Sequence, residues 1–236
     1  MCLKNKRILI TAGPTWVPID EVRVISNTAS GATGILLAEK LSRLGAKVTL
    51  LLGPAPFVGA GLKPAPTAET CNAGARHAVP LRKNIKIIRF HFFDELKKFI
   101  STELESAKYD AVIHSAAVAD YRPRKPRRQK IRSGLKHLRL DLVPTEKIID
   151  SIKKRNSSLY LVGFKFEPSD SKAVLIREAA VLARRSRADL VVANTTVKDK
   201  YLAYFVKGRT ISGPMTCKTE MTHQLCKMLK EGLCRS

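Results

Sequence analysis

The sequence of 236 residues predicts a three-layer α/β fold around a doubly wound, mainly parallel sheet. Short runs of leucine and β-branched residues alternate along the chain with longer stretches whose apolar positions recur at helical spacing. The short runs are continuously apolar, which is typical of parallel strands covered on both faces. Hydrophobic residues at 44% and charged residues at 27% are ordinary globular values, so we expect a single domain over residues 1–236. Such a fold is Rossmann-like and binds its ligands beyond the carboxyl ends of the strands.

The first half of the chain predicts strands and helices in alternation. Ile8–Thr11 is a short apolar strand that ends at turn residues. In the first helix, Ser30 is placed to cap the first turn and Gly45 to end the last. A stretch rich in Gly, Pro and Ala runs from Gly53 to Pro80. The other elements predicted here are strands at residues 47–52, 85–90 and 111–116 and a helix at residues 94–106.

The second half of the chain continues this pattern and ends in a hairpin and a helix. Thr145 is placed to cap a helix over residues 145–155. The hairpin is predicted over residues 203–212, with its turn at Lys207 and Gly208. The other predicted elements are strands at residues 159–164 and 189–193 and helices at residues 171–187 and about 217–233. We expect ligands near the loops that begin at Thr11, Ala116, Phe164 and Ala193.

The balance of charge is the unusual feature of the composition. The 43 Lys and Arg residues against 20 Asp and Glu residues give a formal net charge of +23. This excess attracts anionic partners such as nucleic acid, a membrane surface or phosphorylated small molecules. Aromatic residues make up only 6%, which weakens the case for a platform that stacks single-stranded nucleic acid.

A basic segment follows the strand at residues 111–116. Nine Lys and Arg residues fall between Arg122 and Arg139, where two prolines and a Ser-Gly pair predict an extended flap at about residues 120–142. Composition alone favours a solvated charged face. The flap leaves the sheet where ligands bind, however, and a mobile basic loop can close over a polyphosphate. Asp120 lies at the base of the flap, where its carboxylate could bind a metal ion or a ligand hydroxyl. The alternative is that it only caps the loop.

The loop from Asn27 to Gly34 leads into a helix, and small residues at a helix N-terminus offer unpaired N–H groups to a phosphate. The two glycines of this loop, Gly31 and Gly34, would equally permit close packing of helix and sheet. A dinucleotide site is disfavoured, because the strand at residues 47–52 ends without the acidic residue that binds a ribose hydroxyl. Asn194 and Phe164 each end a predicted strand, and either could line a base pocket. The other interpretation is that Asn194 forms a turn and that Phe164 packs in the core.

Cysteine spacing and hydropathy exclude several classes of protein. The five cysteines are odd in number and scattered, so they predict reduced thiols rather than a disulfide framework or a zinc site. No stretch has the character of a signal peptide or the length of a membrane span. We therefore expect a cytoplasmic protein with no membrane partner.

The most informative segments, in chain order, are Gly13–Gly34, Ser115–Pro123, Lys130–Arg132, Val162–Phe164 and Ala188–Asn194. Together they resemble the phosphopantothenoylcysteine synthetase family, also called phosphopantothenate-cysteine ligase. Nothing in the chain resembles the flavin-dependent decarboxylase to which this domain is fused in many bacteria. The resemblance therefore implies a stand-alone form that binds no FMN, and a homodimer with active sites near the subunit interface.

The resemblance implies a two-step ligation in coenzyme A biosynthesis. The carboxylate of 4′-phosphopantothenate attacks the α-phosphate of a nucleoside triphosphate, CTP in most bacterial members and ATP in eukaryotic ones, giving an acyl-nucleotide and pyrophosphate. The amine of L-cysteine then attacks the acyl carbon and releases the nucleoside monophosphate. Both reactants of the first step are anionic, so catalysis must come mainly from charge neutralisation and positioning, with Mg²⁺ on the phosphates.

The family's functional residues carry over to this sequence by position. Asn27 matches the asparagine that contacts the acyl-nucleotide, and Lys130, ten residues after Asp120, matches the flap lysine needed for turnover. Asp120 is also the candidate metal ligand. The implied nucleotide-binding residues are Gly13, Ser115, Ala116, Asp120, Glu146, Lys147, Ile148, Ile149 and Phe164, and the implied substrate-binding residues are Ser30, Gly31, Ala117 and Asn194.

Three departures from the family pattern bear on the choice of CTP over ATP. Residues 32–33 are Ala-Thr where many members have Lys-Met, and residues 146–148 are Glu-Lys-Ile where many bacterial members have Pro-Asp-Ile. Leu182 and Ser186 stand in place of two lysines. Two alternatives remain from other classes, a basic nucleic-acid-binding module and an NAD(P)-dependent reductase. The chain contains no recognised nucleic-acid-binding motif, so we expect no specific nucleic-acid partner.

Overall fold

The computed structural model describes residues 3–54 and 84–234, so most of the Gly/Pro/Ala-rich stretch lies outside the described residues. The helices are α1 (Ala32–Arg43), α2 (Phe93–Ser106), α3 (Ile148–Arg155), α4 (Lys172–Ser186) and α5 (Lys218–Leu233). The strands of the main sheet are β1 (Arg7–Ala12), β4 (Lys47–Leu52), β5 (Ile85–Arg89), β6 (Ala111–His114), β9 (Tyr160–Phe166), β10 (Leu190–Val197), β11 (Lys200–Lys207) and β12 (Thr210–Met215).

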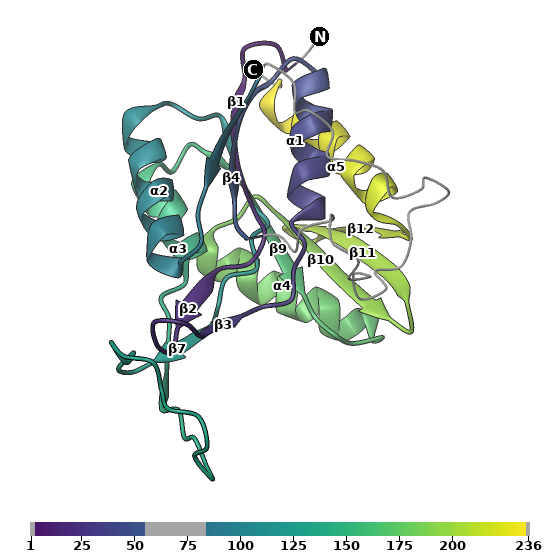
Figure 1. The fold of residues 1–236 in the computed structure, drawn as a ribbon. Helices are drawn as coiled ribbons and strands as arrows, with labels where there is room; N and C mark the ends of the chain where they lie inside the picture. The colour runs from purple at the N-terminus through teal and green to yellow at the C-terminus, as the bar shows by residue number, and fades with distance from the viewer. Residues whose placement is uncertain (1–2, 55–83, 235–236) are drawn as a thin grey trace.

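An eight-stranded sheet forms the centre of the molecule, with strand order β12-β11-β10-β9-β6-β1-β4-β5 (Figure 1). Neighbouring strands from β10 to β5 are parallel. β11 and β12 join as antiparallel strands at one edge. The predicted fold class, a mainly parallel doubly wound sheet with a C-terminal hairpin, is confirmed.

Helices cover both faces of this sheet (Figure 1). α1 and α5 pack on one face, in a cluster that includes Ile8 and Ile10 of β1. α2, α3 and α4 pack on the other face, in a cluster that includes Leu9 of β1 and Val112 of β6. Successive side chains of a strand point to opposite faces, so Thr11 follows Leu9 onto the face of α2, α3 and α4.

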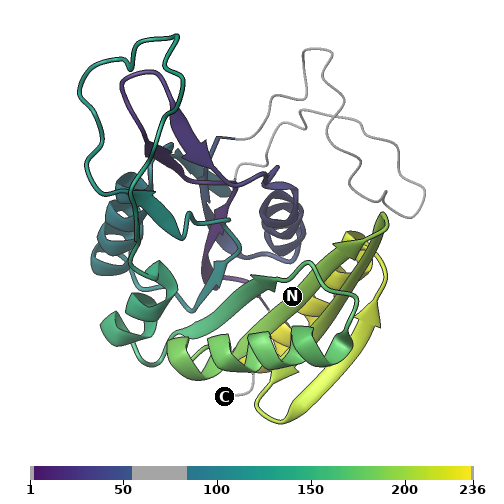
Figure 2. The same ribbon diagram turned by 90° about the horizontal axis from the view of Figure 1, so that it is seen from below.

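Two small antiparallel hairpins, which sequence analysis did not predict, follow β1 and β6. β2 (Trp16–Pro18) pairs with β3 (Val24–Ser26), and β7 (Tyr121–Pro123) pairs with β8 (Leu142–Pro144). β7 and β8 form the base of the predicted flap, whose loop spans residues 124–141. The flap and the β2–β3 hairpin lie side by side (Figure 2), and the Arg127 N–H donates to the Ile19 carbonyl at 2.9 Å.

The structure corrects the predicted start of α3. The helix begins at Ile148, with Lys147 as its N-cap residue, and not at Thr145. The Thr145 hydroxyl donates instead to the Ala119 carbonyl at 2.6 Å. Thr145 therefore belongs to a loop contact between distant segments and does not cap a helix.

Two strands are longer than the sequence predicted. β9 continues to Phe166 and β10 continues to Val197, because each has a hydrogen-bonded neighbour along its whole length. Phe164 and Asn194 consequently lie within strands and not at their ends.

Two other expectations concern the cysteines and membrane spans. Cys217 and Cys226 are buried thiols, as predicted. Cys234 is disulfide-bonded, so the prediction of reduced thiols is wrong for this residue. No helix in the described part of the chain is long and apolar enough to cross a membrane.

Gly34 sets the distance between α1 and β1, and its substitution tests that contact. A Cβ atom at Gly34 would lie 2.4 Å from the Cβ atom of Ala12. We expect Gly34→Ala to lower the free energy of unfolding by about 1–3 kcal/mol, because overpacking outweighs the helix propensity that alanine adds. Urea unfolding followed by circular dichroism measures this change, with Thr33→Ala in the same turn as the control. Unchanged stability of Gly34→Ala would contradict the close contact.

Candidate active site

The loop after β6, residues 115–120, is held by the loop after β1. These strands are neighbours, so their carboxyl ends leave the sheet side by side. The Ala117 N–H donates to the Gly13 carbonyl at 2.9 Å, and the Thr15 N–H donates to the Ala117 carbonyl at 3.2 Å. The hydroxyl of buried Thr15 accepts the Ala119 N–H at 2.9 Å. The structure thus brings together four predicted site residues, Gly13, Ser115, Ala116 and Ala117.

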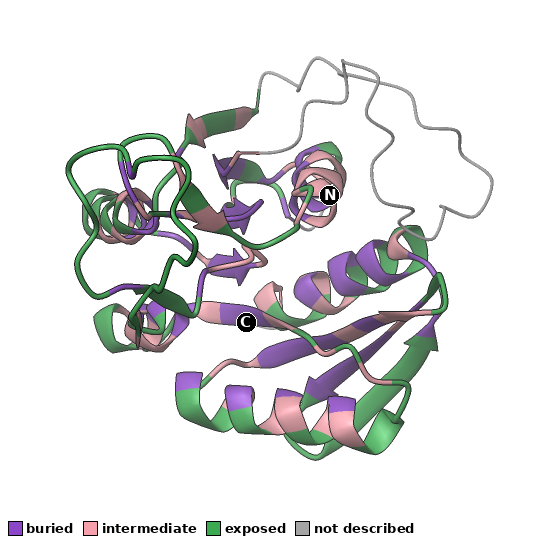
Figure 3. Ribbon diagram, turned by 60° about the horizontal axis from the view of Figure 1, so that its bottom comes forward, coloured by how far each residue is buried: buried purple, intermediate pink, exposed green. Residues whose placement is uncertain are grey.

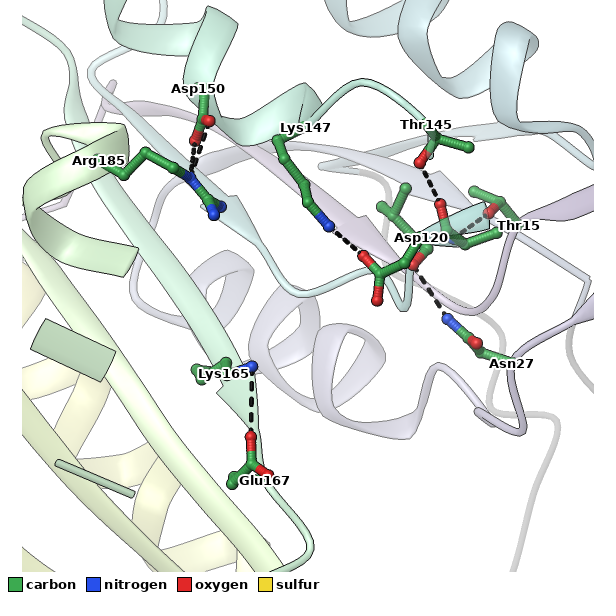
Figure 4. Close-up of polar contacts among 11 residues, drawn as sticks. Thr15, Asn27, Asp120, Thr145, Lys147, Asp150, Lys165, Glu167 and Arg185 are labelled. Carbon is green, nitrogen blue, oxygen red and sulfur yellow. Dashed lines mark hydrogen bonds and ion pairs between the residues drawn. The ribbon is translucent and has the colours of Figure 1, made fainter. Parts of the chain in front are cut away.

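Asn27 and Thr145 bind the same loop from two other segments (Figure 4). The side-chain amide of Asn27, just after β3, donates to the Val118 carbonyl at 3.0 Å. Thr145, just after β8, also donates its N–H to the Asp120 carbonyl at 2.9 Å. The predicted catalytic residue Asn27 therefore lies beside the loop that ends in Asp120, although 91 positions separate Asn27 from Val118.

The carboxylate of Asp120 forms an ion pair with Lys147 at the start of α3 (Figure 4). Both side chains remain accessible, with 65% of Asp120 and 42% of Lys147 exposed. An exposed ion pair contributes at most about 1 kcal/mol to stability, so this pair mainly orients its two groups. Lys147 stands where many bacterial members of the resembled family have aspartate, so a cation faces Asp120 in this chain.

Three other residues of the predicted nucleotide site face away from Asp120. Glu146 forms an ion pair with Lys97 of α2 at 2.7 Å. The hydrogen bond from Lys97, together with its charge, lowers the pKa of the Glu146 carboxyl. The side chains of Ile148 and Ile149 are buried in the core beneath α3. These two isoleucines can therefore offer a ligand only their backbone groups.

The start of α1 packs against the loop after β1. Gly31 has a φ of 72°, and a Cβ atom there would lie 3.2 Å from the Gly13 nitrogen, so this position favours glycine. The Ser30 hydroxyl accepts the Ala32 N–H at 3.4 Å, although the N-cap residue is Gly31 and not Ser30. The predicted substrate-binding residues Ser30 and Gly31 are thereby placed next to the loop after β1.

Phe164 and Asn194 lie farther along the same edge, in β9 and β10. Phe164 is half-buried against the core on the α1 side. The carbonyl of half-buried Asn194 accepts the Glu167 N–H at 3.0 Å, and Glu167 forms an ion pair with Lys165 (Figure 4). Among the described residues, no hydrogen bond or ion pair joins Phe164 or Asn194 to Asp120.

Asp20 anchors the flap to the β2–β3 hairpin, and sequence analysis missed it. Its buried carboxylate accepts the N–H groups of Ile131 at 3.0 Å, Val22 at 2.9 Å and Arg23 at 2.8 Å. The Arg23 guanidinium donates to the same carboxylate at 2.5 Å and to the Ile131 carbonyl at 3.2 Å. The hydrogen bond from Ile131, with those from Val22 and Arg23, holds the pKa of Asp20 far below its usual value. The only sequence signal, an aspartate three residues before an arginine, indicates the local pair of Asp20 with Arg23 and not the contact with Ile131.

Beyond the anchor, the flap is largely exposed (Figure 3). Lys130 precedes the anchored Ile131, and its ammonium has no partner among the described residues. Arg124 pairs with Asp141 at 2.7 Å near the base. The flap surrounds a hollow of about 460 Å³ whose charged lining residues are Arg124, Lys125, Arg127, Arg139 and Asp141. This excess of cations suits a ligand with several negative charges.

Comparisons with known proteins identify the family. A doubly wound α/β domain of this kind belongs to a broad class of folds that hold their ligands at the carboxyl edge of the sheet. The sequence matches the family described as DNA/pantothenate metabolism flavoprotein C-terminal domain over residues 3–73 and 71–233. The chain belongs to this family, which confirms the resemblance found in the sequence.

Relatives and solved structures support this membership. The coenzyme A biosynthesis bifunctional protein CoaBC of Thermococcus kodakarensis is 36% identical over 195 residues, which is 82% of this chain and 42% of that protein. The matched part of the chain therefore spans less than half the length of this relative. A DNA/pantothenate metabolism flavoprotein from Streptococcus pneumoniae has a TM-score of 0.77 and 25% identity, covering 96% of this chain and 99% of the other. The C-terminal domain of a CoaBC protein has a TM-score of 0.70 and 25% identity, covering 98% and 97%.

Asp20→Asn tests the anchor of the flap. The amide keeps one acceptor but loses the charge, and hydrogen bonds to a charged group contribute about 1.5–3 kcal/mol. We therefore expect trypsin at pH 7 to cleave the flap at least about tenfold faster. Glu21→Gln, which removes an exposed charge next to Asp20, is the control.

Acid tests the same anchor in the unmodified protein. The pKa of Asp20 is lower in the folded than in the unfolded chain, so its stabilisation is present above the ordinary value of 3.8 and is lost as the pH falls further. Trp16 in β2 is the one tryptophan of the sequence, and its fluorescence should report this loss. Wild-type cleavage and an unaltered acid response in Asp20→Asn would contradict the anchor.

Proposed function

We propose that this chain is a phosphopantothenate-cysteine ligase of coenzyme A biosynthesis, with CTP as the nucleotide. The observation that carries the proposal is the meeting of Asn27, Asp120 and Lys147 at the carboxyl edge of the sheet, next to a cationic flap. Family membership supports it, as does the name of the Thermococcus kodakarensis relative, a bifunctional protein of coenzyme A biosynthesis.

The reaction has two steps. In the first, a carboxylate oxygen of 4′-phosphopantothenate forms a bond to the α-phosphorus, and the bond to pyrophosphate breaks. In the second, the amine of L-cysteine attacks the acyl carbon, an amide forms, a proton is lost and the nucleoside monophosphate leaves. The first step brings two anions together, so cations that neutralise the phosphates are the main catalytic requirement. The Lys130 ammonium, which has no partner among the described residues, supplies such a charge from the flap.

The loop after β6 offers its backbone to the nucleotide. Hydrogen bonds within the described part of the chain occupy the N–H groups of Ala116, Ala117 and Ala119 and the carbonyls of Ala117, Val118 and Ala119. None of those bonds involves the Ala116 carbonyl or the Val118 N–H. One acceptor and one donor thus remain at this edge, which is the pattern needed to bind the edge of a base.

The residues present fit an Mg²⁺ ion that arrives with the triphosphate. The described residues contain no cluster of three His, Cys, Asp or Glu side chains. Mg²⁺ in nucleotide sites is held largely by phosphate oxygens and water, with one or two carboxylates from the protein. The accessible Asp120 can provide one carboxylate. Such an ion would supply positive charge at the phosphates.

A ligation assay tests this function and the role of the flap. With 4′-phosphopantothenate, L-cysteine, Mg²⁺ and CTP, we expect release of pyrophosphate and CMP, and ATP, GTP and UTP in the same assay rank the nucleotides. Lys130→Ala should slow turnover about 10²–10³-fold without changing thermal unfolding, because it removes a charge on the phosphates. Lys136→Ala is the control, because it removes the charge of another exposed flap lysine that the family resemblance does not place in the site.

Each part of this assay has its own contrary outcome. If no nucleoside triphosphate supports product formation, the proposed function is wrong. Turnover in Lys130→Ala that equals the wild type would refute the flap role alone.

An apolar surface on the β2–β3 hairpin supports a homodimer with active sites near the interface. Val22, Val24 and Phe92 are 62%, 38% and 38% exposed. With Trp16 they line a hollow of about 430 Å³. Scattered exposed apolar side chains are ordinary, whereas a contiguous group indicates an interaction surface. A second copy of the chain that covered this surface would lie next to the anchored flap.

Val22→Asp tests the dimer. A charge in a desolvated interface should raise the dissociation constant of the dimer at least about tenfold, as measured by sedimentation velocity. Val181→Asp is the matched control, because Val181 is 42% exposed on α4, outside this surface. A wild-type chain that sediments as a monomer at micromolar concentration would overturn the proposal.

A further inference from the structure

Thr11 and His114 form a buried polar pair directly below the loop after β6. They are register partners in the parallel ladder of β1 and β6, with exposed fractions of 0% and 7%. The Thr11 hydroxyl oxygen lies 3.0 Å from Nδ1 of His114 and accepts the Ala116 N–H at 3.2 Å. Neither residue was among those predicted for the site, and the ligation mechanism does not use them.

The Thr11 side chain fixes the peptide group that precedes Ala116. The peptide group that follows is fixed by backbone alone, through the 2.9 Å hydrogen bond from the Ala117 N–H to the Gly13 carbonyl. Ser115 donates both its N–H, at 3.1 Å, and its hydroxyl, at 2.7 Å, to the Thr11 carbonyl. Ala116 is thus held on both sides, and the hydroxyl of Thr11 is the side-chain group that does so.

The ring of His114 lies where it can orient the Thr11 hydroxyl. Burial lowers the pKa of His114 to about 4, so its ring is neutral at pH 7, and in the tautomer that carries its proton on Nε2 the Nδ1 atom accepts a hydrogen bond. A hydroxyl has one proton and two lone pairs. When Thr11 directs its proton to Nδ1, a lone pair is left for the Ala116 N–H.

We propose that Thr11 and His114 are positioning residues for the nucleotide. The ring of His114 orients the Thr11 hydroxyl, the hydroxyl fixes the peptide before Ala116, and the Ala116 backbone is thereby presented to the bound nucleoside triphosphate. This inference rests on the proposed function. Because the pair lies behind the loop, it acts through Ala116 and touches no substrate.

Substitutions at Thr11 separate positioning from folding. Thr11→Val keeps the shape of the side chain and removes the hydroxyl, which leaves the Ala116 N–H and His114 Nδ1 without their partner. We expect the KM for the nucleotide to rise about tenfold with kcat within about threefold, because ground-state contacts are weakened and the phosphate chemistry is untouched. Thr11→Ser, which restores the hydroxyl, should return the KM to within about twofold of the wild type.

His114 is tested in the same way. His114→Leu removes the acceptor and should raise the nucleotide KM as Thr11→Val does. His114→Asn places an amide oxygen near the position of Nδ1 and should retain most of the affinity. Thr49→Val is the matched control, because Thr49 is a buried β4 threonine whose hydroxyl meets Tyr109 at 2.9 Å, away from the loop. Its nucleotide KM should equal that of the wild type.

Amide hydrogen exchange tests the pair without any substrate. The Ala116 N–H should exchange at least about tenfold faster in Thr11→Val than in Thr49→Val, since its acceptor is lost only in the former. Unchanged exchange would overturn the inference even if ligation fails in the wild type, a failure that would count against the proposed function alone. Faster exchange with an unchanged nucleotide KM would also overturn it, because the contact with Thr11 would then order the loop without affecting nucleotide binding.

Discussion

The candidate site depends on one constraint, which is that the backbone groups of the loop after β6 need hydrogen-bond partners. Residues 115–120 leave the sheet next to β1 and are partly buried. Each of their N–H and carbonyl groups would cost about 1–3 kcal/mol if it were buried without a partner. Those partners come from the loop after β1, from Asn27 after β3 and from Thr145 after β8. Residues from distant segments meet at Asp120 because they must all bond to this stretch of chain.

The acidic side chains at the flap also have partners, which are nearby Lys and Arg residues. The chain has few acids for a net charge of +23, and four of them contact cations at the flap or at its base. The pairs are Asp20 with Arg23, Asp141 with Arg124, Asp120 with Lys147 and Asp94 with Arg122. Asp20 is buried and the other three acids are exposed, so solvent and salt weaken only the latter pairs. The flap is thus anchored by one carboxylate and stays cationic where a polyphosphate would lie.

Features that depend on local pattern could be predicted from the sequence, whereas features decided by distant partners could not. The main strands and helices follow from apolar periodicity, whereas Asn27 was chosen by its match to a family motif and its role stays a prediction. Thr145 has the side chain of a helix cap, but the Ala119 carbonyl takes its hydroxyl and α3 starts three residues later. The strands of the two hairpins are three residues long, too short to show a period. Aspartate is usually exposed, whereas the Asp20 carboxylate is buried and accepts the N–H of the distant residue Ile131.

By itself, the sequence determined the layers of the fold and indicated the edge of the sheet where the candidate site lies. Continuous apolar runs that alternate with amphipathic stretches bury their side chains as a parallel sheet between helices, and parallel strands all end at one edge. The tertiary structure alone decided which polar groups meet there. Lys147 contacts Asp120 across 27 positions, Thr11 contacts His114 across 103, and Ile131 contacts Asp20 across 111. Hydrogen bonds act over about 3 Å, and only the folded chain brings such groups that close.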